Sequence, residues 1–171
     1  MKNLINMHIK NAGTFIAASV IAVVSATSVD AATTTNSFTA QIVITEDCDI
    51  VSAGDLDFGS AGVLASNVDV TSTLSVQCTN STTYDIGLDA GIGSGADTTT
   101  RKMMDGAEFV NYQMFSDSGR SSNWGDVVGT DTVASTGNGA AQIHTIYGRV
   151  PVQSTPSAGT YLDTVTVTVT F

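Results

Sequence analysis

Two cysteines, Cys48 and Cys78, are the residues of this sequence best suited to covalent chemistry. A metal site or a redox pair would need close spacing or histidine partners, and His144 is the only histidine beyond the N-terminal region. In an exported chain, an even pair of cysteines instead predicts one disulfide. Closing a loop of about 30 residues would stabilise the fold by roughly 3–4 kcal/mol.

The carboxylates and the single tryptophan give weaker indications of chemistry. Asp85 and Asp89 share one face of a strand pattern, but four residues along a strand separate them too far to act on one bond. No G-x-S-x-G motif is present, so we expect no enzymatic activity and no cofactor or metal. Trp124 could form an aromatic patch for a sugar or anchor the protein core, and we favour the core.

The N-terminal region has the pattern of a signal peptide. Lys2 and Lys10 precede an apolar run over residues 15–24, and the small-x-small triplet Val29-Asp30-Ala31 follows. The run of about ten residues is shorter than the roughly 20 that span a bilayer. We therefore predict a cleaved signal peptide over residues 1–31 and no membrane insertion.

The remaining length and charge indicate one acidic domain. About 140 residues is a common domain size, and the whole sequence has 6 basic against 16 acidic residues. Such a chain lacks the basic surface that nucleic acids require. We expect no nucleic-acid partner.

Strand patterns dominate the sequence after the signal peptide. The clearest is residues 160–171, TYLDTVTVTVTF, in which one face is apolar and the other carries threonines. Asp163 is the exception on the apolar face. Alternating runs also cover residues 38–45, 68–78 and 84–90, and two less regular runs cover 109–116 and 142–150. Glycine-rich turns separate them, which predicts an all-β sandwich of about six strands, one fewer than is usual for an immunoglobulin-like domain.

Several segments together resemble the spore coat protein U family, which includes the Csu-type subunits of archaic chaperone–usher pili. The matching segments, in order, are DLDFG at 55–59, SVQCTN around Cys78, RKM at 101–103, YQMFSD-x-GR at 112–120 with Trp124-Gly125, IYGRVP at 146–151 and TPSAGTYLDTVTVTVTF at 155–171. Each is weak alone, but their order and spacing across nearly the whole predicted mature chain make the resemblance specific.

The resemblance implies an incomplete immunoglobulin-like sandwich that a donor strand completes. A periplasmic chaperone would fill the gap first, and the N-terminal segment of the next subunit would replace it at an outer-membrane usher. The fibre would be exported through the periplasm to the cell surface for adhesion and biofilm formation. The residues expected to line the acceptor groove and contact the chaperone are Tyr161, Val165, Val167, Val169 and Phe171.

The expected donor strand is the alternating run Phe38, Ala40, Ile42 and Ile44. The same run could instead be the domain's own first strand, which would leave no large apolar residue to donate. We favour the donor interpretation, with an N-terminal segment over 32–47 and the pilin domain over 48–171. The alternatives are a self-complete secreted coat protein and a small carbohydrate-binding module that uses the Trp124 region.

Overall fold

The computed structural model describes residues 30–171. The predicted signal peptide, residues 1–31, thus lies almost wholly outside the described residues. The chain divides into two units, Met1–Gln41 and Ile42–Phe171. Within the first unit, residues 30–41 contain no helix or strand, and their side chains are exposed. None of the described residues belongs to a helix long and apolar enough to cross a membrane.

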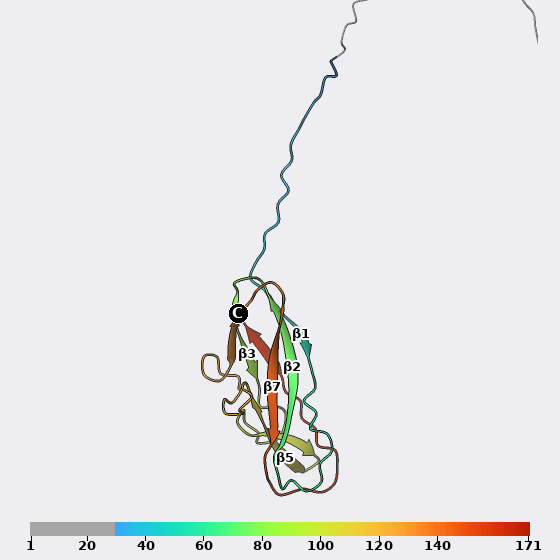
Figure 1. The fold of residues 1–171 in the computed structure, drawn as a ribbon, viewed down its shortest axis with the longest axis vertical. Coiled ribbons are helices and arrows are strands. Elements are labelled where there is room, and N and C mark those ends of the chain that lie inside the picture. The colour runs from blue at the N-terminus through green and yellow to red at the C-terminus, as the bar shows by residue number, and fades with distance from the viewer. Residues whose placement is uncertain (1–29) are drawn as a thin grey trace, which may run out of the picture. The chain divides into compact units, whose positions relative to one another are not determined.

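The second unit folds as two antiparallel β-sheets (Figure 1). One sheet has five strands in the order β1-β2-β7-β5-β4, and the other has three in the order β6-β3-β8. The strands are β1 Cys48–Ala53, β2 Val68–Cys78, β3 Thr83–Leu88, β4 Arg101–Asp105, β5 Glu108–Phe115, β6 Val133–Thr136, β7 Ala141–Val150 and β8 Val167–Thr170. The described residues contain no helix, so the predicted all-β class is confirmed.

The long pairing between β2 and β7 is the central ladder of the larger sheet. Their register runs without interruption from Val68 opposite Val150 to Gln77 opposite Ala141. The alternation of β2 turns Leu74, Val76 and Cys78 inward, where at most 2% of each residue is exposed. This period-two pattern is what places a hydrophobic core between the two sheets.

The core continues on β3 and in the loop that carries Trp124. Tyr84, Ile86 and Leu88 are almost fully buried on β3. Trp124 is 1% exposed, and its indole N–H donates to the Ile86 carbonyl at 2.8 Å. A buried tryptophan needs such an acceptor for its one polar atom.

The observed strands differ from the sequence expectation in number and extent. Four predicted runs correspond to β2, β3, β5 and β7, but the short strands β1, β4 and β6 were not predicted. They have four to six residues and little period-two alternation, so they depend on pairing with neighbours. Of the predicted C-terminal strand, only β8 forms a regular strand. An isolated bridge between Leu162 and Met104 precedes it.

Candidate functional site

The smaller sheet has two edge strands, β6 and β8, and β8 is the one that carries the C-terminal apolar pattern. This strand pairs with β3, from Leu88 opposite Val167 to Asp85 opposite Thr170. The strand order β6-β3-β8 leaves its other side without a β partner in the described chain. An unpaired edge presents backbone N–H and C=O groups that another strand can pair with.

The apolar face that leads into β8 is only half covered. Tyr161, Val165, Val167 and Val169 pack against the core but stay partly exposed, and they alternate with exposed threonines. Ile86, opposite Val169 on the neighbouring strand, is fully buried. Phe171 is 55% exposed. The sandwich is therefore less completely covered along β8 than along β3.

The predicted donor run lies outside both sheets. No residue from 30 to 47 belongs to a strand, and β1 begins only at Cys48. Phe38 is 93% exposed, Ile42 81% and Ile44 69%, and Ala40 is also exposed. Exposed apolar side chains in such a series mark an interaction segment or an aggregation hazard.

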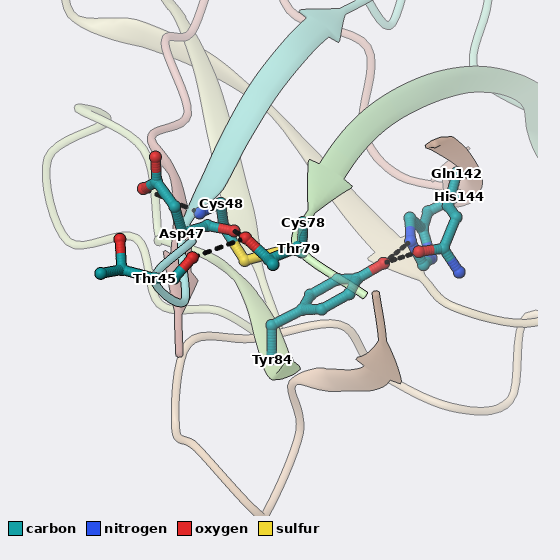
Figure 2. Close-up of a disulfide and its surroundings, with 8 residues drawn as sticks. All are labelled: Thr45, Asp47, Cys48, Cys78, Thr79, Tyr84, Gln142 and His144. Carbon is teal, nitrogen blue, oxygen red and sulfur yellow. Dashed lines mark hydrogen bonds between the residues drawn. A yellow bond between two sulfur atoms is a disulfide. The ribbon is translucent and has the colours of Figure 1, made fainter. Parts of the chain in front are cut away.

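The cysteines form the predicted disulfide at the start of β1 (Figure 2). Cys48 and Cys78 are directly opposite in the β1–β2 register. Beyond the bond, the Thr79 hydroxyl donates to the Thr45 carbonyl at 3.0 Å, and the Thr79 backbone N–H donates to the Asp47 carbonyl at 2.9 Å. The segment that precedes β1 is thus attached to the domain at residues 45–48.

Asp163, the polar exception in the C-terminal pattern, has a set of donors around it. The Tyr112 hydroxyl donates to its carboxylate at 2.8 Å, and so does the Ile92 backbone N–H. Burial and this hydrogen bond raise the pKa of Tyr112. Gly91, with a φ of +76°, adjoins the carboxylate so closely that a Cβ would collide with it. These contacts attach the residues before β8 to the body of the domain.

Arg101 is the most deeply buried charged residue in the described chain, with 0% exposure. Its guanidinium donates to four backbone carbonyls at 2.7–2.8 Å rather than to a carboxylate. The acceptors are Leu88, Asp89, Thr98 and Trp124. The rigid fork of an arginine suits such a set, and it connects the end of β3, the 97–100 turn and the Trp124 loop. The sequence showed Arg101 only as part of a motif, because its acceptors are backbone atoms.

A second arginine cluster fastens β2 to β7. Arg149 makes two bonds of 2.7 Å to the Asp69 carboxylate, and this hydrogen bonding lowers the pKa of Asp69. Arg120 adjoins the same carboxylate at 3.5 Å and donates to the carbonyls of Val70 and Gly148. Arg120 and Arg149 come from two of the quoted motifs and Asp69 from the alternating run at 68–78, and the three side chains meet only in the folded sheet.

The DLDFG and IYGRVP segments also meet in the fold. Leu56 and Phe58 pack so closely over Gly148 that a Cβ there would contact both side chains at 2.8–3.0 Å. Phe58 also makes an edge contact with Tyr112 at 5.9 Å between ring centroids. The glycine of the second segment therefore makes room for the apolar side chains of the first.

The structure does not support a sugar site at Trp124. The indole is buried and hydrogen-bonded inside the core, whereas a sugar-stacking ring must present a face to solvent. The carbohydrate-binding alternative was wrong about this residue because the sequence cannot show which way a tryptophan points. His144, on β7, is half-buried, and its Nε2 lies 3.0 Å from the Tyr84 hydroxyl.

Comparison with known proteins identifies the class. The profile of the family described as Spore Coat Protein U domain matches residues 34–168, and the chain belongs to this family. A curated relative, Protein U of Myxococcus xanthus, is 35% identical over 130 residues, covering 69% of this chain and 72% of that protein.

A solved structure shares the fold. It is the CsuC–CsuE chaperone–tip adhesion subunit pre-assembly complex from the archaic chaperone–usher Csu pili of Acinetobacter baumannii. The match has a TM-score of 0.56 and 28% identity, and it covers 75% of this chain and 40% of that chain. The resemblance stated from the sequence motifs and the incomplete immunoglobulin-like fold are both confirmed.

Proposed function

We propose that this protein is a structural subunit of a chaperone–usher pilus that polymerises by donor-strand complementation. The single observation that supports this best is the combination of a free β8 edge with a half-covered apolar face and an exposed alternating run outside the sandwich. A strand from another molecule would satisfy both features at once.

The energetics of such a joint are favourable. Phe38, Ala40, Ile42 and Ile44 would turn to one side of an added strand, because alternate side chains of a strand share a face. Burying apolar side chains contributes about 1.5–3 kcal/mol each, or roughly 6–12 kcal/mol for four, before ordering costs. Backbone pairing to β8 adds to this, so the joint would be long-lived without covalent chemistry.

The partners follow from this role. Before assembly, a periplasmic chaperone would cover the β8 edge, contacting Tyr161, Val165, Val167, Val169 and the terminal residue Phe171. An outer-membrane usher would then exchange the chaperone for another subunit, and the fibre would reach the cell surface to serve in adhesion and biofilm formation. The solved match to a chaperone–subunit complex supports the chaperone step. In this role the disulfide is structural, and we assign no catalytic residue.

A self-complete secreted coat protein is the alternative function, since the family is named after a spore coat protein. It would fold and stay monomeric without a chaperone. Chaperone dependence of the purified chain therefore separates the two functions.

The test compares two substitutions in the donor run. Ile42→Asp would place a charge on the inserted face and abolish polymerisation, while the chaperone-bound subunit stays soluble. Val43→Asp is the matched control: it is 72% exposed, but it faces the opposite side of the strand and should leave assembly nearly unchanged. The amount of polymer is measured on denaturing gels of unheated samples. Loss of the folded domain in Ile42→Asp, or equal assembly of both variants, would contradict the donor assignment.

A further inference from the structure

Lys102 is the surface cation of the described chain that has no carboxylate partner. Arg120 and Arg149 pair with Asp69, and Arg101 is enclosed by carbonyls. The Lys102 ammonium donates only to the Ser94 carbonyl at 3.2 Å and lies 4.9 Å from the centre of the Phe109 ring. Lys102 is only partly buried, its hydrogen bond lies at the surface, and an ammonium has three N–H donors, so it can also bind an anion from another molecule.

The linker before β1 is short, acidic and attached at one end. Three residues, Thr45, Glu46 and Asp47, separate Ile44 from Cys48. Thr79 holds the backbone of Thr45 and Asp47 to the disulfide end of the domain, as Figure 2 shows. Three extended residues span about 10 Å, so two subunits joined through this linker must lie in contact.

The direction of the donor strand determines which ends meet. Every pairing between strands in the domain is antiparallel, and antiparallel ladders are slightly the more stable kind. The end of β8 lies toward the disulfide end, because Thr170 is opposite Asp85 near the start of β3. Figure 1 shows β8 ending on the same side as the start of β1, with β5 toward the opposite end.

Lys102 lies at the opposite end, beside the residues that lead into β8. Two residues along β4, Met104 pairs with Leu162. The 91–95 loop contacts both Lys102 and the residues before β8. The Ile92 backbone N–H donates to the Asp163 carboxylate, and the Ser94 carbonyl accepts from the Lys102 ammonium. The C-terminal end of an antiparallel donor strand must therefore lie near these residues.

Matching the apolar faces fixes the register closely. If Phe38 lies opposite Val169 or Phe171, the inward side chains of both strands share a face. Glu46 then lies opposite Tyr161 or Asp163, next to the Lys102 end of the acceptor.

The geometry points to Lys102 as the residue through which one copy of this chain receives the Thr45–Asp47 linker of the next copy, by pairing with Glu46 or Asp47. This inference rests on the proposed donor-strand function. It adds a charged contact between neighbouring domains, where the disulfide end of one copy meets the β4 end of the next.

The test uses a zero-length carbodiimide on polymers of the unmodified chain. The reagent joins an amine to a carboxylate in contact with it, and the water removed hydrates the carbodiimide to a urea. Lys2 and Lys10 belong to the predicted signal peptide, so Lys102 is the one lysine of the predicted mature chain. Mass spectrometry of the covalent dimer should identify an amide between Lys102 and Glu46 or Asp47.

A Lys102→Arg variant is the matched control. It keeps the charge, so it should polymerise normally, but a guanidinium does not form this amide and the covalent dimer should disappear. Polymers in which Lys102 couples to no linker carboxylate would overturn the inference and leave donor-strand assembly intact. Absence of any polymer, on heated or unheated gels, would overturn both proposals.

Charge reversal gives a second, kinetic measurement. Lys102→Glu should slow fibre growth by about two- to fivefold at low salt, as expected for an exposed ion pair. Adding Glu46→Lys and Asp47→Lys should restore most of the rate, and high salt should remove the difference. Equal rates for all three proteins at low salt would contradict the contact.

Discussion

At the scale of single residues, the most consequential side chain is Arg101, a buried cation that forms no salt bridge with a carboxylate in the described chain. Burying a charge is costly unless hydrogen bonds replace its water. Arg101 meets this requirement with four carbonyls from three separate segments. It therefore acts as a connector that fixes β3, and through β3 the neighbouring β8 edge.

Replacing Arg101 with Met should destabilise the domain by about 3–5 kcal/mol, because four buried carbonyls lose a charged donor. The measurement is denaturant unfolding of a donor-fused chain, in which residues 36–46 are repeated after Phe171 behind a flexible linker. Arg149→Lys, at an exposed ion pair, should change stability by about 1 kcal/mol or less. Equal losses in the two variants would argue against the connector role.

His144 should make the stability of the domain depend on pH in a narrow window. Burial lowers the pKa of His144 in the folded protein, so the unfolded chain binds the proton more readily. Stability should be full above about pH 7 and decrease as the pH falls through about 6.5 toward the lower folded pKa.

The measurement compares unfolding midpoints of the donor-fused chain at about pH 7 and about pH 5. His144→Gln should remove most of the difference, because Gln does not titrate and can still bond the Tyr84 hydroxyl. If the His144→Gln variant keeps the pH dependence of the unchanged protein, groups other than His144 cause it.

At the scale of elements, the disulfide is placed where β1 would otherwise fray. Cys48 is the first residue of β1, an edge strand of the larger sheet. The bond attaches it to Cys78 at the end of β2, which pairs with β7 along nearly all of its length. A donor segment that leaves the domain at residue 47 is thereby held to a central strand.

Replacing both cysteines with serine in the donor-fused chain should lower its free energy of unfolding by about 3–4 kcal/mol. The loop has a sequence separation of 30 residues, and the oxidised unfolded chain loses entropy through its closure. Chemical denaturation of oxidised, reduced and double-serine protein measures this. Reduced and double-serine proteins should agree, and no loss in either would contradict a stabilising role.

At the scale of the whole molecule, one chain carries both halves of the proposed joint. The unchanged chain should therefore aggregate or polymerise when it is released from its chaperone. The donor-fused chain lacking residues 32–44 should instead be a stable monomer, because its β8 edge is satisfied internally and no donor remains. Light scattering and unheated gels distinguish the two states, and a stable monomer of the unchanged chain would support the coat-protein alternative.

Local patterns in the sequence determined much of the domain. The alternation in residues 68–78 and 161–170 predicted which side chains face inward, because side-chain direction in a strand depends only on position along it. The sequence also showed the cysteine pair that predicted the disulfide and the apolar run at 38–44 that predicted the donor strand. The resemblance carried by the family motifs predicted that the sandwich is incomplete.

Only the tertiary structure decided which strands pair and what the buried polar groups contact. It left β8 at an edge, placed residues 30–47 outside the sheets, buried Trp124 and surrounded Arg101 with carbonyls. These features depend on contacts between residues far apart in the chain, and backbone acceptors look the same at every position of a sequence. Which strands lie at an edge and which distant groups contact one another are properties of the assembled sheets, so no local pattern encodes them.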